Sequence, residues 1–169
     1  QREASYGRTG FALQFMLDTS LEDALKYPLK CSDFIVMDVD KDIAPVKVSY
    51  GSVGEQLDTV LDCGGLKGDR WYRPLYVSPD RAEYTGSVLF VDPSGRGKDR
   101  TGYAVVKTLN GMLFVRRWGS LEGGYDKPTL ESLAHIARAE GVSEVLVESN
   151  FGDGMYTQLL KPVLSSIYP

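Results

Sequence analysis

Two acidic residues, Asp92 and Glu148, each stand at the end of a short apolar stretch, residues 87–92 and 142–148. Both stretches have the composition of buried strands. If the two strands are parallel neighbours, their carboxyl ends lie at one edge of a sheet, and we expect the two carboxylates to meet there. Paired carboxylates suit Mg²⁺ or Mn²⁺, and two such ions activate water and stabilise a leaving phosphate oxygen. The alternative is that each acid is merely solvated or caps a helix.

The loop after the first acid reads Asp-Pro-Ser-Gly-Arg-Gly-Lys-Asp over residues 92–99. It is not a nucleotide phosphate loop, because Asp92 stands where the first glycine belongs and a strand, not a helix, is expected to follow. Its basic residues Arg96, Lys98 and Arg100 are candidate contacts to a phosphate backbone, with ordinary solvated turn charges as the alternative. Asp99 is a candidate auxiliary metal ligand or a turn cap.

The loop after the second acid reads Asn-Phe-Gly-Asp-Gly over residues 150–154. Asn150 is a candidate for orienting a water or contacting a phosphate, although a plain turn residue is the simpler interpretation. We expect Asp153 to cap the helix that follows rather than to bind metal.

The elements that must position these residues follow in the order β-β-β-α-β-α. Strands are expected at 87–92, 101–108, 112–118 and 142–148, with an Asn-Gly hairpin turn at 110–111. Helices are expected at 129–140, stopped by Gly141, and at 155–167, disturbed by Pro162. The first three strands form an antiparallel meander, and the fourth returns after a helix to lie parallel to the first.

Residues 1–85 are less regular and predict a connector with a small core at best. An amphipathic helix is expected over 11–25, short strands over 34–39 and 46–50, and an extended stretch around Pro74 and Pro79. The chain is therefore expected to divide near residue 86, with 86–169 as an α/β domain.

Charge and composition exclude several classes of function. The formal net charge is −4, so the chain as a whole is not a basic nucleic-acid-binding protein. The single histidine, His135, argues against a His-rich zinc site and against a Ser-His triad, and its place among apolar helix positions predicts a structural role. The sequence has no apolar run of about 18 residues, so we expect no membrane span.

The residues around both acids, 91–104 and 148–154, resemble the large terminase subunit of short-tailed double-stranded DNA phages, also called DNA maturase B. The segment 10–18 is similar to the junction that follows the ATPase domain in this family. The resemblance implies a truncated RNase H-like mixed sheet over 86–169, preceded by an irregular connector over 1–85. It also implies a nuclease that cuts concatemeric viral DNA with Mg²⁺ or Mn²⁺ in the host cytoplasm, with Asp92 and Glu148 as the first two acids.

The resemblance further implies partners, and the sequence also differs from the family pattern in two ways. The family acts on double-stranded DNA together with its packaging ATPase domain, a portal and a small terminase subunit. No ATPase motif precedes the connector here, and we expect the chain to stop before the fold's last strand and helix and before its third acid. Two other classes of function stay open: a non-catalytic interaction module, and an ATP-binding domain like those of actin and sugar kinases, which start with a related three-strand hairpin.

Overall fold

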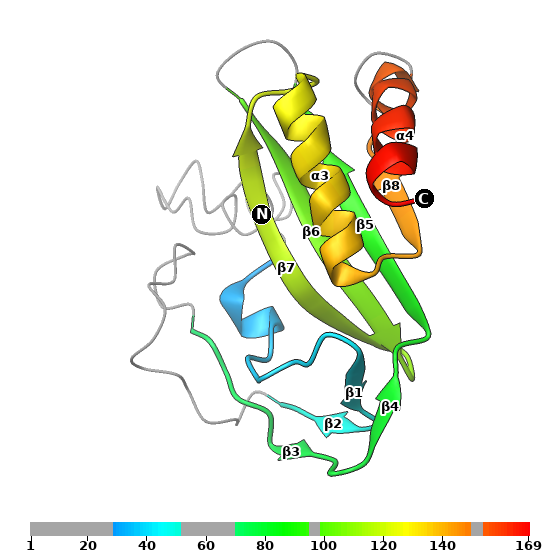
Figure 1. Cartoon of the computed structure of the whole chain (residues 1–169). Helices are drawn as coiled ribbons and strands as arrows, with labels where there is room; N and C mark the ends of the chain where they lie inside the picture. The colour runs from blue at the N-terminus through cyan, green and yellow to red at the C-terminus, as the bar shows by residue number, and fades with distance from the viewer. Residues whose placement is uncertain (1–28, 52–69, 95–98, 150–153) are drawn as a thin grey trace, which may run out of the picture. The chain divides into compact units, whose positions relative to one another are not determined.

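A computed structural model describes residues 29–51, 70–94, 99–149 and 154–169 of the chain (Figure 1). Contacts divide the chain into two compact units, one of residues 1–38 with 48–77 and one of residues 39–47 with 78–169. The second unit contains both predicted acids. The expected domain boundary near residue 86 stays a prediction. By contacts, the segments 39–47 and 78–85 group with the later residues.

A four-stranded mixed sheet forms the centre of the second unit. The strands are β5 (Gly86–Asp92), β6 (Arg100–Leu109), β7 (Met112–Glu122) and β8 (Glu144–Val147), and they lie side by side in the order β7-β6-β5-β8. β5–β6 and β6–β7 pair antiparallel, whereas β8 pairs parallel with β5. The turn between β6 and β7 has positive φ at Asn110 (52°) and Gly111 (76°), as its Asn-Gly sequence requires. The predicted meander with a parallel return is confirmed.

Two helices, α3 (Lys127–Glu140) and α4 (Met155–Ile167), lie on the same side of this sheet (Figure 1). The Asp126 side chain accepts a hydrogen bond from the backbone of Thr129 and so caps the start of α3. Gly141 ends α3 in the left-handed conformation, as predicted. α4 continues through Pro162 over the expected residues.

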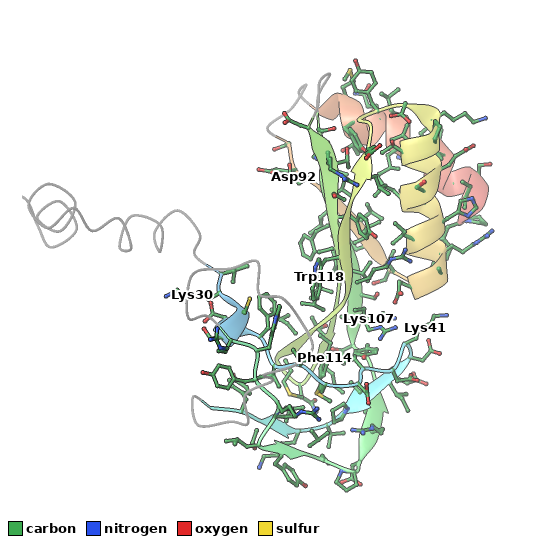
Figure 2. The ribbon with its side chains drawn as sticks, turned by 90° about the vertical axis from the view of Figure 1, so that its left-hand side faces the viewer. Lys30, Lys41, Asp92, Lys107, Phe114 and Trp118 are labelled. Carbon is green, nitrogen blue, oxygen red and sulfur yellow. The ribbon has the colours of Figure 1, made fainter. Side chains whose placement is uncertain are left out.

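The main core lies between the sheet and the two helices. Alternate residues of β5 and β6 point into it and are buried with apolar residues of both helices; this cluster includes Leu89, Val91, Val105, Leu133 and Leu160. The opposite face of the sheet carries apolar residues that stay partly open. Trp118, for example, is 61% exposed and lies on the side away from α3 (Figure 2).

The segment 39–47 crosses the end of the sheet that is remote from Asp92. Its strand β1 (Ile43–Pro45) pairs antiparallel with β4 (Arg81–Glu83). Backbone carbonyls along the segment accept hydrogen bonds from four side chains of the sheet and its entry, namely Tyr84, Lys107, Asn110 and Arg116. Ala44 packs in a second small core with Leu109 and Phe114. Residues 39–47 are therefore an integral part of the second unit.

The first unit contains little regular structure in its described part. A 3₁₀ turn occupies Cys31–Asp33, and β2 (Val48–Ser49) pairs antiparallel with β3 (Tyr76–Val77). The strand expected over 34–39 is wrong: Ile35 makes only an isolated bridge with Tyr72, and the Phe34 ring contacts Trp71 at 6.0 Å between centroids. The strand expected over 46–50 shrinks to two residues. The helix expected over 11–25 lies outside the described residues.

Three very short strands, β1, β3 and β4, went unpredicted. Each spans two or three residues, which is too few to show a periodic pattern in the sequence. Among the described residues, no helix has the length and apolar character needed to cross a membrane.

Candidate active site

The parallel pairing of β5 and β8 brings Asp92 and Glu148 to the same edge of the sheet. Val91 and Val147 are register partners at the ends of the two strands. One residue further, the Glu148 amide donates a hydrogen bond of 2.9 Å to the Val91 carbonyl. The backbone therefore holds the two acid-bearing positions side by side, as the sequence predicts for a parallel return.

The two carboxyl groups contact each other directly. The hydrogen bond between the Glu148 and Asp92 side chains, and then the negative charge of Asp92, raise the pKa of Glu148 above its ordinary value, with a further contribution from desolvation. Both residues are exposed to solvent. A hydrogen bond between two carboxyl groups requires one of them to be protonated, and a bound cation can take the place of that proton by offsetting the repulsion between the two ionised groups.

The donor set fits hard divalent cations. Both groups are carboxylates, they are accessible, and they converge on one point at a sheet edge, so their oxygens are available as ligands for Mg²⁺ or Mn²⁺. Within the part of the chain that the structure describes, no group of three or more His, Cys, Asp or Glu side chains forms a metal-binding cluster. The described site thus consists of the pair alone.

Of the other predicted residues, Asp99 and Arg100 are described. Asp99 is exposed and directly precedes β6. The Arg100 guanidinium lies 3.7 Å from the Glu122 carboxylate and donates to the Ser120 carbonyl at 3.4 Å. Because its side chain stays 54% exposed, this weak surface pair leaves Arg100 available to an anion. Arg96, Lys98 and Asn150, and the expected cap Asp153, lie outside the described residues.

A cluster of buried hydroxyl groups beside the start of β6 was not predicted from the sequence. Ser94, Thr101 and Tyr156 are all at least nine-tenths buried and are linked by hydrogen bonds to one another or to the carbonyls of Gly123 and Gly124. These residues come from three elements. Their types alone give no signal, because Ser in a loop, Thr in a strand and Tyr in a helix are ordinary.

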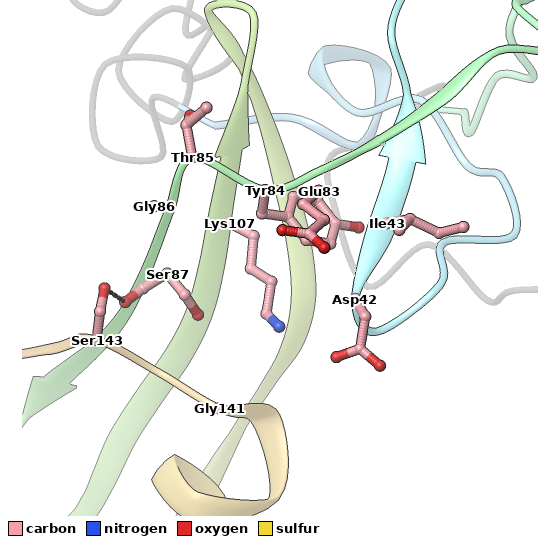
Figure 3. Close-up of a pocket in the computed structure, with 10 residues that line it drawn as sticks. All are labelled: Asp42, Ile43, Glu83, Tyr84, Thr85, Gly86, Ser87, Lys107, Gly141 and Ser143. Carbon is pink, nitrogen blue, oxygen red and sulfur yellow. Dashed lines mark hydrogen bonds between the residues drawn. The ribbon is translucent and has the colours of Figure 1, made fainter.

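A cavity of about 490 Å³ lies at the opposite end of β5, lined by Ser87 and by Lys107 among others (Figure 3). Lys107 is 4% exposed, and its Nζ donates to the Lys41 carbonyl at 2.6 Å. Its ammonium also lies 5.2 Å from the centre of the Tyr84 ring. The buried Lys107 amine therefore helps to hold the segment 39–47 in place. Asp92 lies far from it, at the other end of the sheet (Figure 2).

Comparison with known proteins agrees with this geometry. Residues 91–169 match the family described as "Terminase Bacteriophage T7, Ribonuclease H-like domain". Residues 91–169 belong to this family. The match begins one residue before Asp92 and includes Glu148, so the acid pair falls inside the ribonuclease H-like domain.

The similarity extends beyond the matched domain. The chain is 44% identical over 164 residues to the terminase large subunit of Enterobacteria phage T3, which covers 97% of this chain. The chain spans 28% of the length of that relative. The mixed sheet with two helices on one face is the expected α/β architecture of the ribonuclease H-like terminase domain, and the fold prediction is confirmed.

Proposed function

We propose that this chain is the nuclease part of a phage DNA-packaging terminase, a metal-dependent endonuclease that cuts concatemeric double-stranded viral DNA. The observation that supports the proposal most strongly is the direct contact of the Asp92 and Glu148 carboxyls at the edge of a ribonuclease H-like sheet. When both acids are ionised and no ligand is bound, this approach is unfavourable, since like charges repel. A bound cation makes the same approach favourable.

In this proposal Asp92 and Glu148 hold Mg²⁺ or Mn²⁺, with Asp99 as an auxiliary ligand. When bound, the ions supply the positive charge that activates water and stabilises a leaving phosphate oxygen. The chain's own part is to hold the two carboxylates at one point and to release the proton they share before the metal binds. Arg100, with Arg96, Lys98 and Asn150 in the two loops, contacts the DNA backbone and positions the phosphate.

The proposed setting is the host cytoplasm, where the subunit acts with a packaging ATPase domain, a portal and a small terminase subunit. The family match favours this nuclease over the ATP-binding alternative. Calorimetry with ATP separates the two, because a tight ATP site on this chain would favour the actin-like or sugar-kinase-like interpretation.

The test is nicking of supercoiled plasmid DNA in the presence of Mn²⁺. It uses chain 1–169 and, in parallel, a full-length terminase large subunit that carries these residues. Asp92→Asn and Glu148→Gln should each reduce nicking to background, because each removes a charged ligand while keeping the side chain's size. Asp80→Asn is the matched control: Asp80 is an exposed acid in the turn before β4 and should leave activity unchanged.

Undiminished nicking by Asp92→Asn in the full-length protein would reject the proposal. Silence of chain 1–169 with activity in the longer protein would instead make the chain a non-catalytic module on its own. That result would agree with a third acid outside these residues.

A further inference from the structure

Three buried hydroxyl groups connect the chain that leaves Asp92, the start of β6 and the first turn of α4, the helix that follows Glu148. Ser94 follows Asp92 by two residues, and its hydroxyl donates to the Gly123 carbonyl at 3.0 Å. Thr101 lies in β6, across the same loop, and its hydroxyl donates to the same carbonyl at 3.0 Å. The Ser94 amide donates to Thr101 Oγ1 at 3.2 Å, and the two hydroxyl oxygens lie 3.3 Å apart. The chain leaving Asp92 is therefore fixed to the start of β6.

Tyr156 connects the other acid-bearing segment to the same cluster. It lies in the first turn of α4, the helix that follows Glu148, and its hydroxyl donates to the Gly124 carbonyl at 3.2 Å. Burial raises the pKa of Tyr156, while a hydrogen bond with the Thr101 side chain acts in the opposite direction. Gly123 and Gly124 are neighbours in the chain, so the Tyr156 phenol and the Thr101 hydroxyl bind adjacent carbonyls, and this holds the beginning of α4 near the start of β6.

The cluster is nearly inaccessible to water. Thr101 is 0%, Tyr156 1% and Ser94 6% exposed. In such surroundings a hydroxyl that loses its partner leaves a buried polar group unsatisfied, which destabilises the folded state. The network therefore has one arrangement of lowest free energy, and small displacements of either acid-bearing segment break hydrogen bonds in it.

We propose that Ser94, Thr101 and Tyr156 are positioning residues that set the separation of the Asp92 and Glu148 carboxyls. They touch neither carboxyl and act through the backbone: Ser94 fixes the exit from β5, Tyr156 fixes the start of α4, and Thr101 joins them. This inference rests on the proposed function. It extends that function by naming residues outside the acid pair, the three hydroxyl-bearing residues, that determine where the two acids lie.

The closing experiment compares Thr101→Val with Thr129→Val in metal-free protein. Valine keeps the shape of threonine and removes the hydroxyl. Thr129 is a matched control because it is 3% exposed and its hydroxyl also makes several hydrogen bonds, but only within residues 122–129. The Glu148 N–H donates to the Val91 carbonyl, so its hydrogen-exchange rate measures how firmly the ends of β5 and β8 are held together, and no metal is needed for the measurement.

Thr101→Val should speed exchange at the Glu148 amide relative to amides in the middle of β5. Thr129→Val should leave that ratio unchanged, and Thr101→Ser, which keeps a hydroxyl, should restore it. An unchanged ratio in Thr101→Val, or an equal change in Thr129→Val, overturns the inference. If Thr101→Val does not fold, Ser94→Ala decides by the same ratio, since it removes a smaller group at the edge of the cluster.

A second readout distinguishes positioning from plain stability. In the Mn²⁺-dependent nicking assay, Thr101→Val should raise the Mn²⁺ concentration for half-maximal activity roughly tenfold, as loss of groups behind metal ligands usually does. The rate at saturating Mn²⁺ should stay near that of the wild type. A lowered saturating rate with an unchanged Mn²⁺ midpoint overturns the inference. If the wild-type protein shows no Mn²⁺ response, the proposed function fails, while the metal-free exchange ratio still decides the role of the hydroxyls.

Discussion

The amide of Glu148 donates to the carbonyl of Val91 at 2.9 Å, so the backbone hydrogen-bonding of the parallel strands continues one residue beyond β8. This single bond places Glu148 beside the residue that follows Val91, which is Asp92. The contact of the two carboxyls is thus a consequence of strand register. A shift of one residue would turn one acid to the opposite face of the sheet.

The first prediction concerns the cost of that contact without metal. Wherever both carboxyls are ionised, they repel each other. Asp92→Asn should therefore raise the melting temperature in EDTA at pH 7.5, even though it abolishes metal-dependent nicking. Thermal unfolding followed by circular dichroism measures the effect, and Asp80→Asn, an exposed acid outside the pair, serves as the control.

This stabilising effect of Asp92→Asn should fade in acid. The pKa of Glu148 is raised in the folded chain, so the folded state binds that proton more tightly than the unfolded state. The resulting stability is present below the ordinary glutamate pKa and is lost as the pH rises through the raised value. The advantage of Asp92→Asn in EDTA should disappear as the pH falls through this window. A constant advantage at every pH would contradict the assignment.

The second prediction is a pH dependence of metal binding. The proton that Glu148 shares with Asp92 must leave before both groups act as ligands, so Mn²⁺ and the proton compete. The affinity for Mn²⁺ should fall as the pH falls through the raised pKa of Glu148, at a higher pH than for an isolated glutamate. Isothermal titration calorimetry in buffers of different ionisation enthalpy measures both the affinity and the released protons. Binding without proton release across this window would argue against Glu148 as a ligand.

The third prediction concerns the start of α3. Asp126 Oδ1 accepts a hydrogen bond from the Thr129 amide at 3.1 Å, and this bond lowers the pKa of Asp126 more than any other interaction. Asp126→Ala should reduce the free energy of unfolding by about 1 kcal/mol, the usual value for such a cap. The loss should shrink as the pH falls through the lowered pKa of Asp126, because a protonated cap accepts less strongly.

Glu131 offers a matched control for the cap. It lies in the same helix and pairs with Lys127 at 3.5 Å on the surface, where such a pair contributes about 0.3–0.5 kcal/mol. Glu131→Ala should therefore cost clearly less than Asp126→Ala in chemical denaturation. Equal losses would show that general helix charge, and not the cap, accounts for the effect.

Much of the second unit was predictable because its signals are local and periodic. The apolar stretch before Asp92, the Asn110-Gly111 turn and the Gly141 stop each specify one element from a few neighbouring residues. The right-handed return after a helix then leaves one place for β8, beside β5. The meeting of the two acids followed from that topology.

Other features could not be predicted because they depend on partners distant in sequence. The Thr101 hydroxyl can be buried because the Gly123 carbonyl, in the turn before α3, accepts its hydrogen bond. The Lys107 ammonium likewise depends on the Lys41 carbonyl, 66 positions earlier in the chain. A lysine inside a strand otherwise indicates a solvent-facing position. The short strands β1 and β4 likewise exist through their mutual pairing, with no periodic pattern of their own.

The last prediction tests whether residues 39–47 belong to the folded second unit. Phe114 is 6% exposed and packs with Ala44 of that segment and with Leu109, whereas its neighbour Leu113 is 72% exposed. Phe114→Ala should cost about 3–5 kcal/mol of unfolding free energy, because it removes buried apolar surface and leaves a cavity. It should also speed hydrogen exchange at the Val46 amide, which directly follows β1 and donates to the Asp80 carbonyl beside β4.

Leu113→Ala is the control on the same strand and should change stability by no more than about 0.5 kcal/mol. If both variants lose the same stability, the small core around Ala44 contributes nothing specific. If Phe114→Ala destabilises the unit while exchange at the Val46 amide stays at the wild-type rate, the segment is held by its hydrogen bonds alone. In that case Lys107→Met, which removes the buried donor to the Lys41 carbonyl, should release it.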